Sequence, residues 1–191
     1  MLKMVLVLAG ATELDQQNRI KGSLDVPLCR EGAQQVEKMA SEIDEMELDA
    51  IYAGPCLAVQ QTAEQISRSG DIKVKTEENL RNLNRGLWSG KSIDELKANQ
   101  PKVYRQWQEN PETICPPDGE SIEEARTRAE QTVKKIRRKH KKGHVALVVS
   151  EPFASVLRSV IDEKVALENL WDAECRSGCW EWVPDTPKIA V

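Results

Sequence analysis

Short apolar runs alternate along the chain with longer stretches in which apolar residues recur at helical spacing. The runs Val5–Leu8, Leu48–Ala53 and His144–Val149 are rich in β-branched and aliphatic residues, and glycine or proline follows each within three positions. This pattern predicts buried strands. The most apolar run, His144–Val149, is expected to be the central strand, buried on both faces. Lys73–Lys75 predicts a short edge strand.

The stretches between these runs predict helices. A helix is expected to open at Glu31-Gly32 because Ala33, Val36, Met39 and Ala40 follow helical spacing. Three further helices are predicted from the same kind of pattern, at Leu57–Ser67, between Pro101 and Pro111, and at Ala154–Ile161.

A capping box gives the strongest single helix signal. Ser121 is followed three residues later by Glu124, which is typical of a helix start. The helix is expected to reach Lys139 and to be capped by Gly143. Its buried face is predicted to carry Ala125, Ala129, Val133 and Ile136.

Strands that alternate with helices predict an α/β fold, a three-layer α/β/α sandwich with a mostly parallel central sheet. At 191 residues the chain is expected to form a single domain over residues 1–191. The tail, Gly178–Val191, predicts a terminal hairpin or one strand with an extension. Ligands of such sheets bind beyond the carboxyl ends of the strands, here Leu8–Gly10, Ala53–Pro55 and Ser150–Pro152.

Charge and composition narrow the function. Thirty-one acidic and 27 basic residues give a net charge of −4, which argues against a nucleic-acid partner. The basic run Lys134–Lys142 is interpreted as a solvated helix end whose cations complement the helix dipole. The five cysteines follow no disulfide or zinc pattern, and two histidines are too few for a histidine-rich metal centre. We expect no metal and no cofactor.

Met1–Ala11 is too short to span a membrane and lacks a signal-peptide cleavage pattern. The chain is therefore expected to be cytoplasmic, with no membrane partner. Trp180 and Trp182 share one face of a predicted strand, where they either cover the sheet or form a patch for a partner.

The order of the motifs resembles that of the histidine phosphatase (phosphoglycerate mutase-like) superfamily. After the first strand the chain keeps the family residues Gly10, Thr12, Arg19, Gly22, Asp25, Pro27, Leu28, Gly32 and Gln35. Further matches are Pro55, Gln61–Ala63, Leu80-Arg81, Gly86–Gly90 and Gly119–Ser121. The resemblance covers nearly the whole chain and implies the fold predicted above.

The resemblance fails at the residues that carry the family's chemistry. Leu8-Ala9 stands where the family has Arg-His, and Ala58 where it has a phosphate-binding arginine. Asn82 replaces the general-acid glutamate. Glu151-Pro152 replaces the second His and the glycine after it.

These replacements remove each part of a phosphoryl-transfer site. Transfer to histidine needs an imidazole nucleophile, cations around the phosphoryl oxygens and a proton donor for the leaving group. A carboxylate about 4 Å from a unit anion costs about 4 kcal/mol at an effective dielectric of ~20. The sequence therefore predicts a catalytically inactive pseudophosphatase that acts as a binding or regulatory module.

Other polar residues are expected to line the same crevice. Arg19 and Arg81 match retained family positions, with loop pinning as their alternative role. Glu13, Asp15 and Glu151 form an acidic group that either holds a cation or an amine, or is solvated and paired with arginine. His140 and His144 are expected at the surface, away from the site. The full predicted lining is Thr12, Glu13, Asp15, Arg19, Lys21, Arg81, Glu151 and Pro152.

Two rival functions stay open from the residues alone. One is an enzyme of different chemistry that uses Glu151 as general acid or base, assisted by Asp15 or Arg81. The other is residual phosphatase or mutase activity. For the inactive protein, the expected partner is an unidentified protein or a neutral or cationic small molecule, and the sequence predicts no oligomeric state.

Overall fold

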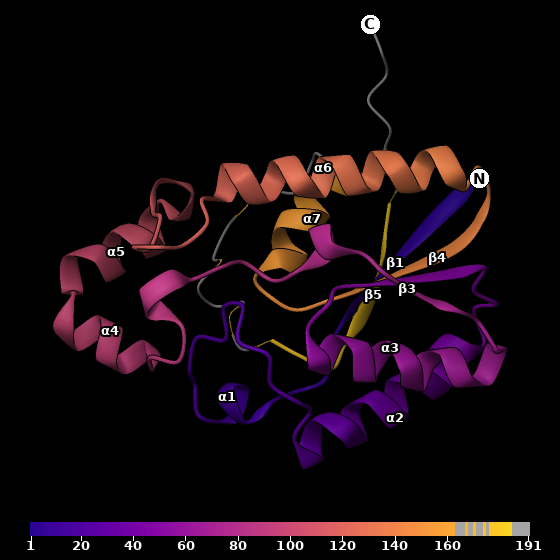
Figure 1. Ribbon diagram of the computed structural model, residues 1–191, viewed down its shortest axis with the longest axis horizontal. Helices are drawn as coiled ribbons and strands as arrows, with labels where there is room; N and C mark the ends of the chain where they lie inside the picture. Colours follow the sequence, from indigo (N-terminus) through magenta and orange to yellow (C-terminus); the bar gives the residue numbers. More distant parts are fainter. Residues whose placement is uncertain (163–166, 168–169, 171–173, 175, 185–191) are drawn as a thin grey trace, which may run out of the picture.

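The computed structural model describes residues 1–162, 167, 170, 174 and 176–184. Its centre is a five-stranded sheet of order β3-β2-β4-β1-β5 (Figure 1). The strands are β1 (Leu2–Leu8), β2 (Ala50–Ala53), β3 (Val74–Thr76), β4 (Gly143–Val149) and β5 (Trp180–Val183). The first four run parallel, and β5 is antiparallel to β1 at one edge. The central place of β4 and the edge place of β3 confirm the predictions.

Two pairs of helices cover the faces of the sheet (Figure 1). One core cluster joins β1 residues such as Leu6 and Leu8 to α6 (Ile122–Lys139) and α7 (Phe153–Ile161). The alternate β1 residues, Val5 and Val7, pack with α2 (Arg30–Asp44) and α3 (Leu57–Gly70). This period-two division of β1 is expected of a strand buried on both faces. The α/β fold with a mostly parallel sheet is confirmed.

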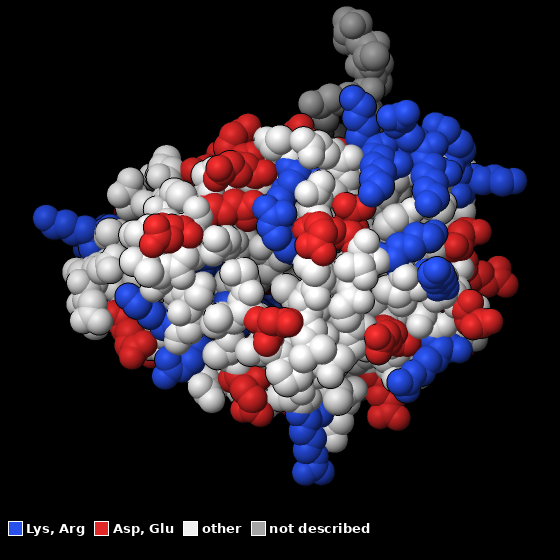
Figure 2. All heavy atoms as spheres, in the orientation of Figure 1, with Lys and Arg blue, Asp and Glu red and all other residues white. Residues whose placement is uncertain are grey.

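Helix α6 begins as the sequence predicts. The Ser121 hydroxyl accepts from the Glu124 N–H at 3.2 Å, and the Glu124 carboxylate accepts from the Ser121 N–H at 2.8 Å. All four apolar residues predicted to form its buried face are buried. Exposed lysine and arginine side chains gather over its C-terminal end, including Arg138 and Lys139 (Figure 2).

A small lobe beside the sheet was not predicted as a separate core. It contains η2 (Gly86–Trp88), α4 (Ile93–Asn99), α5 (Pro101–Glu109) and η3 (Pro111–Thr113). Trp107 and Trp88 pack against each other in the core of the lobe, with tilted rings whose centroids are 5.3 Å apart. The start of α4 is a capping box formed by Ser92 and Glu95.

Two local features differ from the sequence-based expectations. The short helix α1 (Glu13–Gln16) was not predicted. Gly143 does not cap α6, because the helix ends at His140 and Gly143 instead opens β4 with φ +93°. Of the predicted tail, β5 is present, and residues 185–191, which would decide between a hairpin and one strand with an extension, lie outside the described residues. Among the described residues, no helix is both long and apolar enough to cross a bilayer.

Candidate functional site

The five positions that depart from the family pattern meet at the carboxyl ends of the parallel strands. The Ala9 N–H donates to the Val149 carbonyl at 2.9 Å, two residues before Glu151. Thr62 of α3 links this helix to the end of β1, because its hydroxyl accepts from the Gly10 N–H and donates to the Ala58 carbonyl.

Asn82 closes this arrangement from the loop after η1 (Glu78–Leu80). Its side-chain oxygen accepts from the Phe153 N–H at 3.2 Å, at the start of α7. Its amide donates to the Gly22 carbonyl at 3.0 Å. The sequence-predicted site is therefore one place in the fold, as the family resemblance implies.

The side chains at these positions are packed away from solvent. Leu8, Ala9, Ala58, Asn82 and Glu151 are each at most 4% exposed. The backbone just before β5 is hydrogen-bonded to both Leu8 and Ala9. The Leu8 N–H donates to the Cys179 carbonyl at 2.8 Å, and the Ala9 carbonyl accepts from the Gly178 N–H. None of the five supplies an imidazole or a cation.

Glu151 is turned into the protein at the N-terminal end of α7. Its Oε2 accepts from both the N–H and the hydroxyl of Ser155 at 2.9 Å. Its Oε1 lies 3.7 Å from Arg158 Nη2 and 3.9 Å from Arg176 Nη1. Burial raises the pKa of the Glu151 carboxyl, while the Ser155 hydrogen bonds and the two arginines work in the lowering direction. The Glu151–Pro152 peptide bond is cis, and Pro152 is buried beside it.

Two buried ion pairs occupy the neighbouring space. The Lys21 ammonium lies 2.6 Å from Asp15 Oδ1, with both side chains at most 7% exposed. The Arg85 Nε–H donates to Glu174 Oε1 at 2.7 Å, and both side chains are almost fully buried. Charges on Lys21 and Asp15 influence Glu174, so the two pairs lie close together. Burial raises the pKa of Glu174, with Arg85 opposing it.

Of the predicted lining residues, Thr12 and Asp15 form the cap of α1. The Thr12 N–H and hydroxyl both donate to Asp15 Oδ2, at 2.7 and 2.8 Å. Glu13 is exposed on α1. Asp15 therefore serves both the cap and the pair with Lys21.

Arg19 and Arg81 lie further out. Arg19 donates to the Gly90 carbonyl at 2.7 Å, which pins the loop. Arg81 lies 3.5 Å from Glu120 and lines a hollow of about 400 Å³ together with Arg128. The Arg19 contact is of the loop-pinning kind, whereas Arg81 faces a carboxylate. Of the acidic group, Asp15 pairs with Lys21, and Glu151 lies near Arg158 and Arg176. The described residues hold no cluster of three or more His, Cys, Asp or Glu side chains placed to bind a metal.

Sequence reasoning missed several polar residues near this site. Arg85 precedes the retained Gly86–Gly90 motif, which was the only signal for it. Glu174 follows no motif. Cys56 lies beside Asn82, and burial raises the pKa of its thiol, with the backbone of Asn82 opposing this. A thiol held in its neutral form is a poor nucleophile.

The two histidines lie at other ends of their elements, His140 at the C-terminal end of α6 and His144 near the start of β4, and neither is fully exposed. His140 Nε2 lies 3.0 Å from the Tyr52 hydroxyl, and burial lowers the pKa of the imidazole. His144 Nδ1 lies 2.6 Å from the Met46 carbonyl. Both are half-buried, which corrects the expectation of plain surface residues.

Comparison with known proteins places these observations in a family. Residues 4–186 match the profile of the histidine phosphatase superfamily (branch 1). Phosphoserine phosphatase 1 of Hydrogenobacter thermophilus is 27% identical over 92% of this chain and 82% of its own length. Phosphoglycerate mutase-like protein 4 of Arabidopsis thaliana is 24% identical over 90% of this chain and 81% of its own length.

Solved structures show the same fold. A mycobacterial glucosyl-3-phosphoglycerate phosphatase complexed with VO3 superposes with a TM-score of 0.84 at 20% identity, covering 94% of this chain and 90% of that one. YhfR of Bacillus stearothermophilus superposes with a TM-score of 0.79 at 26% identity, covering 90% and 84% of the two chains.

Proposed function

Because this chain belongs to the histidine phosphatase superfamily (branch 1), we propose that it is a catalytically inactive member that acts as a binding or regulatory module. The observation that carries the proposal is the buried, non-nucleophilic character of the crevice positions. Leu8 and Ala9 lie where the family resemblance puts Arg-His, and both are packed against neighbouring backbone. These two side chains offer a phosphoryl group no nucleophile, and each is at most 4% exposed.

Electrostatics support the same proposal. Stabilising a transferring phosphoryl group needs cations that are free to hold its oxygens. The nearby Lys21 and Arg85 are each already neutralised by a carboxylate, Asp15 and Glu174. A phosphomonoester would have to displace these buried pairs, and breaking a buried pair by removing one partner typically costs 3–5 kcal/mol.

A thermal-shift titration tests the binding side of the proposal. A ligand that binds only the folded state raises its stability by RT ln(1 + [L]/Kd). We expect inorganic phosphate, vanadate and phosphoserine to leave the melting temperature unchanged. The Hydrogenobacter thermophilus relative is the positive control. A saturable rise with phosphate or vanadate, abolished by Arg85→Met or Lys21→Met, would contradict the proposal.

One observation favours a second candidate, an enzyme of different chemistry at Glu151. A buried carboxyl with a raised pKa beside two arginines is the kind of group that serves as general acid or base. Its test is a matched pair of variants. Any activity that needs Glu151 is lost in Glu151→Gln but kept in Glu181→Gln, because Glu181 is another carboxylate paired with Arg158 and is partly exposed.

The partner is proposed to be a protein or a neutral or cationic small molecule. Of the cations described around the crevice, Lys21 and Arg85 form buried pairs with carboxylates, and Arg158 and Arg176 lie within 4 Å of Glu151, which leaves an anionic ligand little unopposed positive charge. Relatives named as phosphatases or mutases bind anionic substrates, and the proposed change of ligand class follows from that difference in charge.

A further inference from the structure

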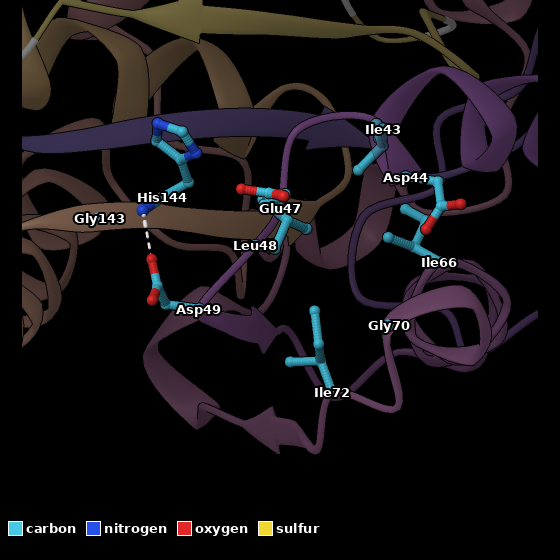
Figure 3. A pocket seen from close by; sticks show the side chains of 10 residues that line it. All are labelled: Ile43, Asp44, Glu47, Leu48, Asp49, Ile66, Gly70, Ile72, Gly143 and His144. Carbon is cyan, nitrogen blue, oxygen red and sulfur yellow. Dashed lines mark hydrogen bonds between the residues drawn. The ribbon is translucent and has the colours of Figure 1, made fainter.

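A hollow of about 740 Å³ lies between the C-terminal end of α2 and the edge strand β5. A second hollow, of about 620 Å³, lies beside it towards α3. Glu47 and His144 line both hollows, so the two are neighbours, and we call them together the acidic–aromatic groove. The close-up of the second hollow shows the Glu47 side chain directed towards the side on which His144 lies (Figure 3). The first hollow is lined by Ser41, Glu42, Glu45, Met46, Glu47, His144, Trp180 and Trp182.

Two tryptophans of β5 form the aromatic wall of this groove. Trp182 is 41% exposed, and its ring meets His144 edge-on at a centroid distance of 5.3 Å. The Trp180 indole N–H donates to Glu42 at 2.8 Å, which fixes the ring against α2. Lys3 already places its ammonium 5.8 Å from the centroid of the Trp182 ring. A cation within about 6 Å of an indole face is attracted by the ring quadrupole.

The charge of the groove is one-sided. Glu42, Glu45 and Glu47 line the first hollow, and the residues lining the two hollows include no lysine or arginine. The groove also meets the C-terminal end of α2, whose last turn contains no basic residue. Free carbonyls make a helix C-terminus negative, and cations normally complement it. Lys3 lies near the Trp182 ring, and the described residues that line the two hollows supply no further cation to this negative helix end.

We propose that the acidic–aromatic groove binds a lysine- or arginine-containing segment of a partner protein. The cationic side chain would lie against Trp182, between Glu45 and Glu47, in the place that complements both the rings and the helix end. An extended peptide suits this surface better than a single amine, because a second hollow lies next to the first, beside Glu47 and His144. That hollow adds the apolar side chains of Ile66 and Ile72 (Figure 3).

The groove is at the amino end of the sheet, opposite the crevice. His144 lies at the start of β4, whereas Glu151 follows its end. Peptide binding at the groove therefore does not depend on whether the crevice is catalytically inactive, and each proposal can be disproved without the other.

Calorimetric titration with a capped, lysine- and arginine-rich peptide tests this inference. We expect Trp182→Ala to weaken binding about fivefold, in line with the 0.5–1 kcal/mol typical of exposed cation–π contacts. Glu45→Gln should weaken it about twofold to fivefold, and added salt should weaken it further. Lys3→Ala should strengthen it, because an internal competitor for Trp182 is removed. The matched control is Glu37→Gln, which removes the same charge from α2 outside the groove.

Three results would overturn the inference. The first is equal affinity for the parent protein, Trp182→Ala and Glu45→Gln. The second is binding of free arginine or a polyamine as tight as that of the peptide, which would assign the groove to small cations. The third is a dimer in sedimentation that Trp182→Ala dissociates, which would assign this face to a second copy of the chain.

Discussion

Arg85 and Glu174, 89 residues apart in sequence, form a buried hydrogen-bonded ion pair next to the crevice. The Arg85 guanidinium also lies 5.1 Å from the centroid of the Trp107 ring, so it joins the crevice to the core of the small lobe. With the second buried pair, Lys21 and Asp15, this means that both cations beside the crevice already have a carboxylate of the protein as their counter-charge.

A double-mutant cycle measures this pair. Arg85→Met and Glu174→Leu should each lower the free energy of unfolding by about 3–5 kcal/mol, because each leaves one charge buried without its partner. The double variant should lose clearly less than the sum of the two, because two apolar side chains need no partner. Urea unfolding monitored by circular dichroism gives the three values. Strict additivity would mean that the pair contributes no coupling.

The pH dependence of stability reports on Glu151. Burial raises the pKa of its carboxyl above the ordinary value of 4.5. Between 4.5 and the raised pKa the folded state holds more protons than the unfolded state, so stability falls as pH rises through this window. Glu151→Gln should remove this loss and gain stability relative to the parent as pH rises. Glu174 acts in the same direction, so some slope should persist.

Unfolding free energies of the parent protein and Glu151→Gln, measured from about pH 4.5 to neutral, provide the comparison. Glu181→Gln serves as the control, because Glu181 also pairs with Arg158 but is partly exposed. Parallel curves for the parent protein and Glu151→Gln would show that Glu151 ionises normally.

Gly143 has a backbone conformation that favours glycine, and it also lies close to the Asp49 side chain. Its φ is +93°, and a Cβ added there would lie 2.0 Å from Asp49 Oδ2. Gly143→Ala should therefore destabilise the protein by more than the 1–3 kcal/mol typical of a strained backbone alone. Gly90→Ala separates the two causes, because Gly90 has φ +82° but a Cβ added there would lie 3.8 Å from Leu24 Cδ1, an ordinary contact. Equal losses in thermal unfolding for the two variants would refute a role for Asp49.

The layers of the fold were predictable because local signals and burial agree. In α6 the capping box, the spacing of apolar residues and the terminal cations all point to one helix. The position of β4 followed from its unbroken apolar run, which only a central strand buries on both faces. The location of the crevice followed from motif order, through Ala9, Asn82 and Glu151.

What the sequence could not predict are contacts between distant segments. Nothing in the local sequence pattern pairs Arg85 with Glu174. This buried pair matters because the carboxylate offsets the positive charge of Arg85 beside the crevice. Gly143 was assigned to the end of α6 because glycine is common there. Its true role depends on Asp49, the residue just before β2, which lies close to it. The groove at Trp182 was likewise unpredictable, because its lining comes from α2 and β5, which are far apart in the sequence.

The central claim, that this member of the superfamily does not turn over phosphomonoesters, is tested most directly by steady-state hydrolysis of phosphoserine and p-nitrophenyl phosphate. Phosphate release is followed across mildly acidic to mildly alkaline pH, with the Hydrogenobacter thermophilus relative assayed in parallel. We predict release no faster than the buffer blank and no covalent phosphoprotein, because Ala9 supplies no nucleophile. Turnover that follows the purified protein and disappears in Glu151→Gln, but not in Glu181→Gln, would contradict the account.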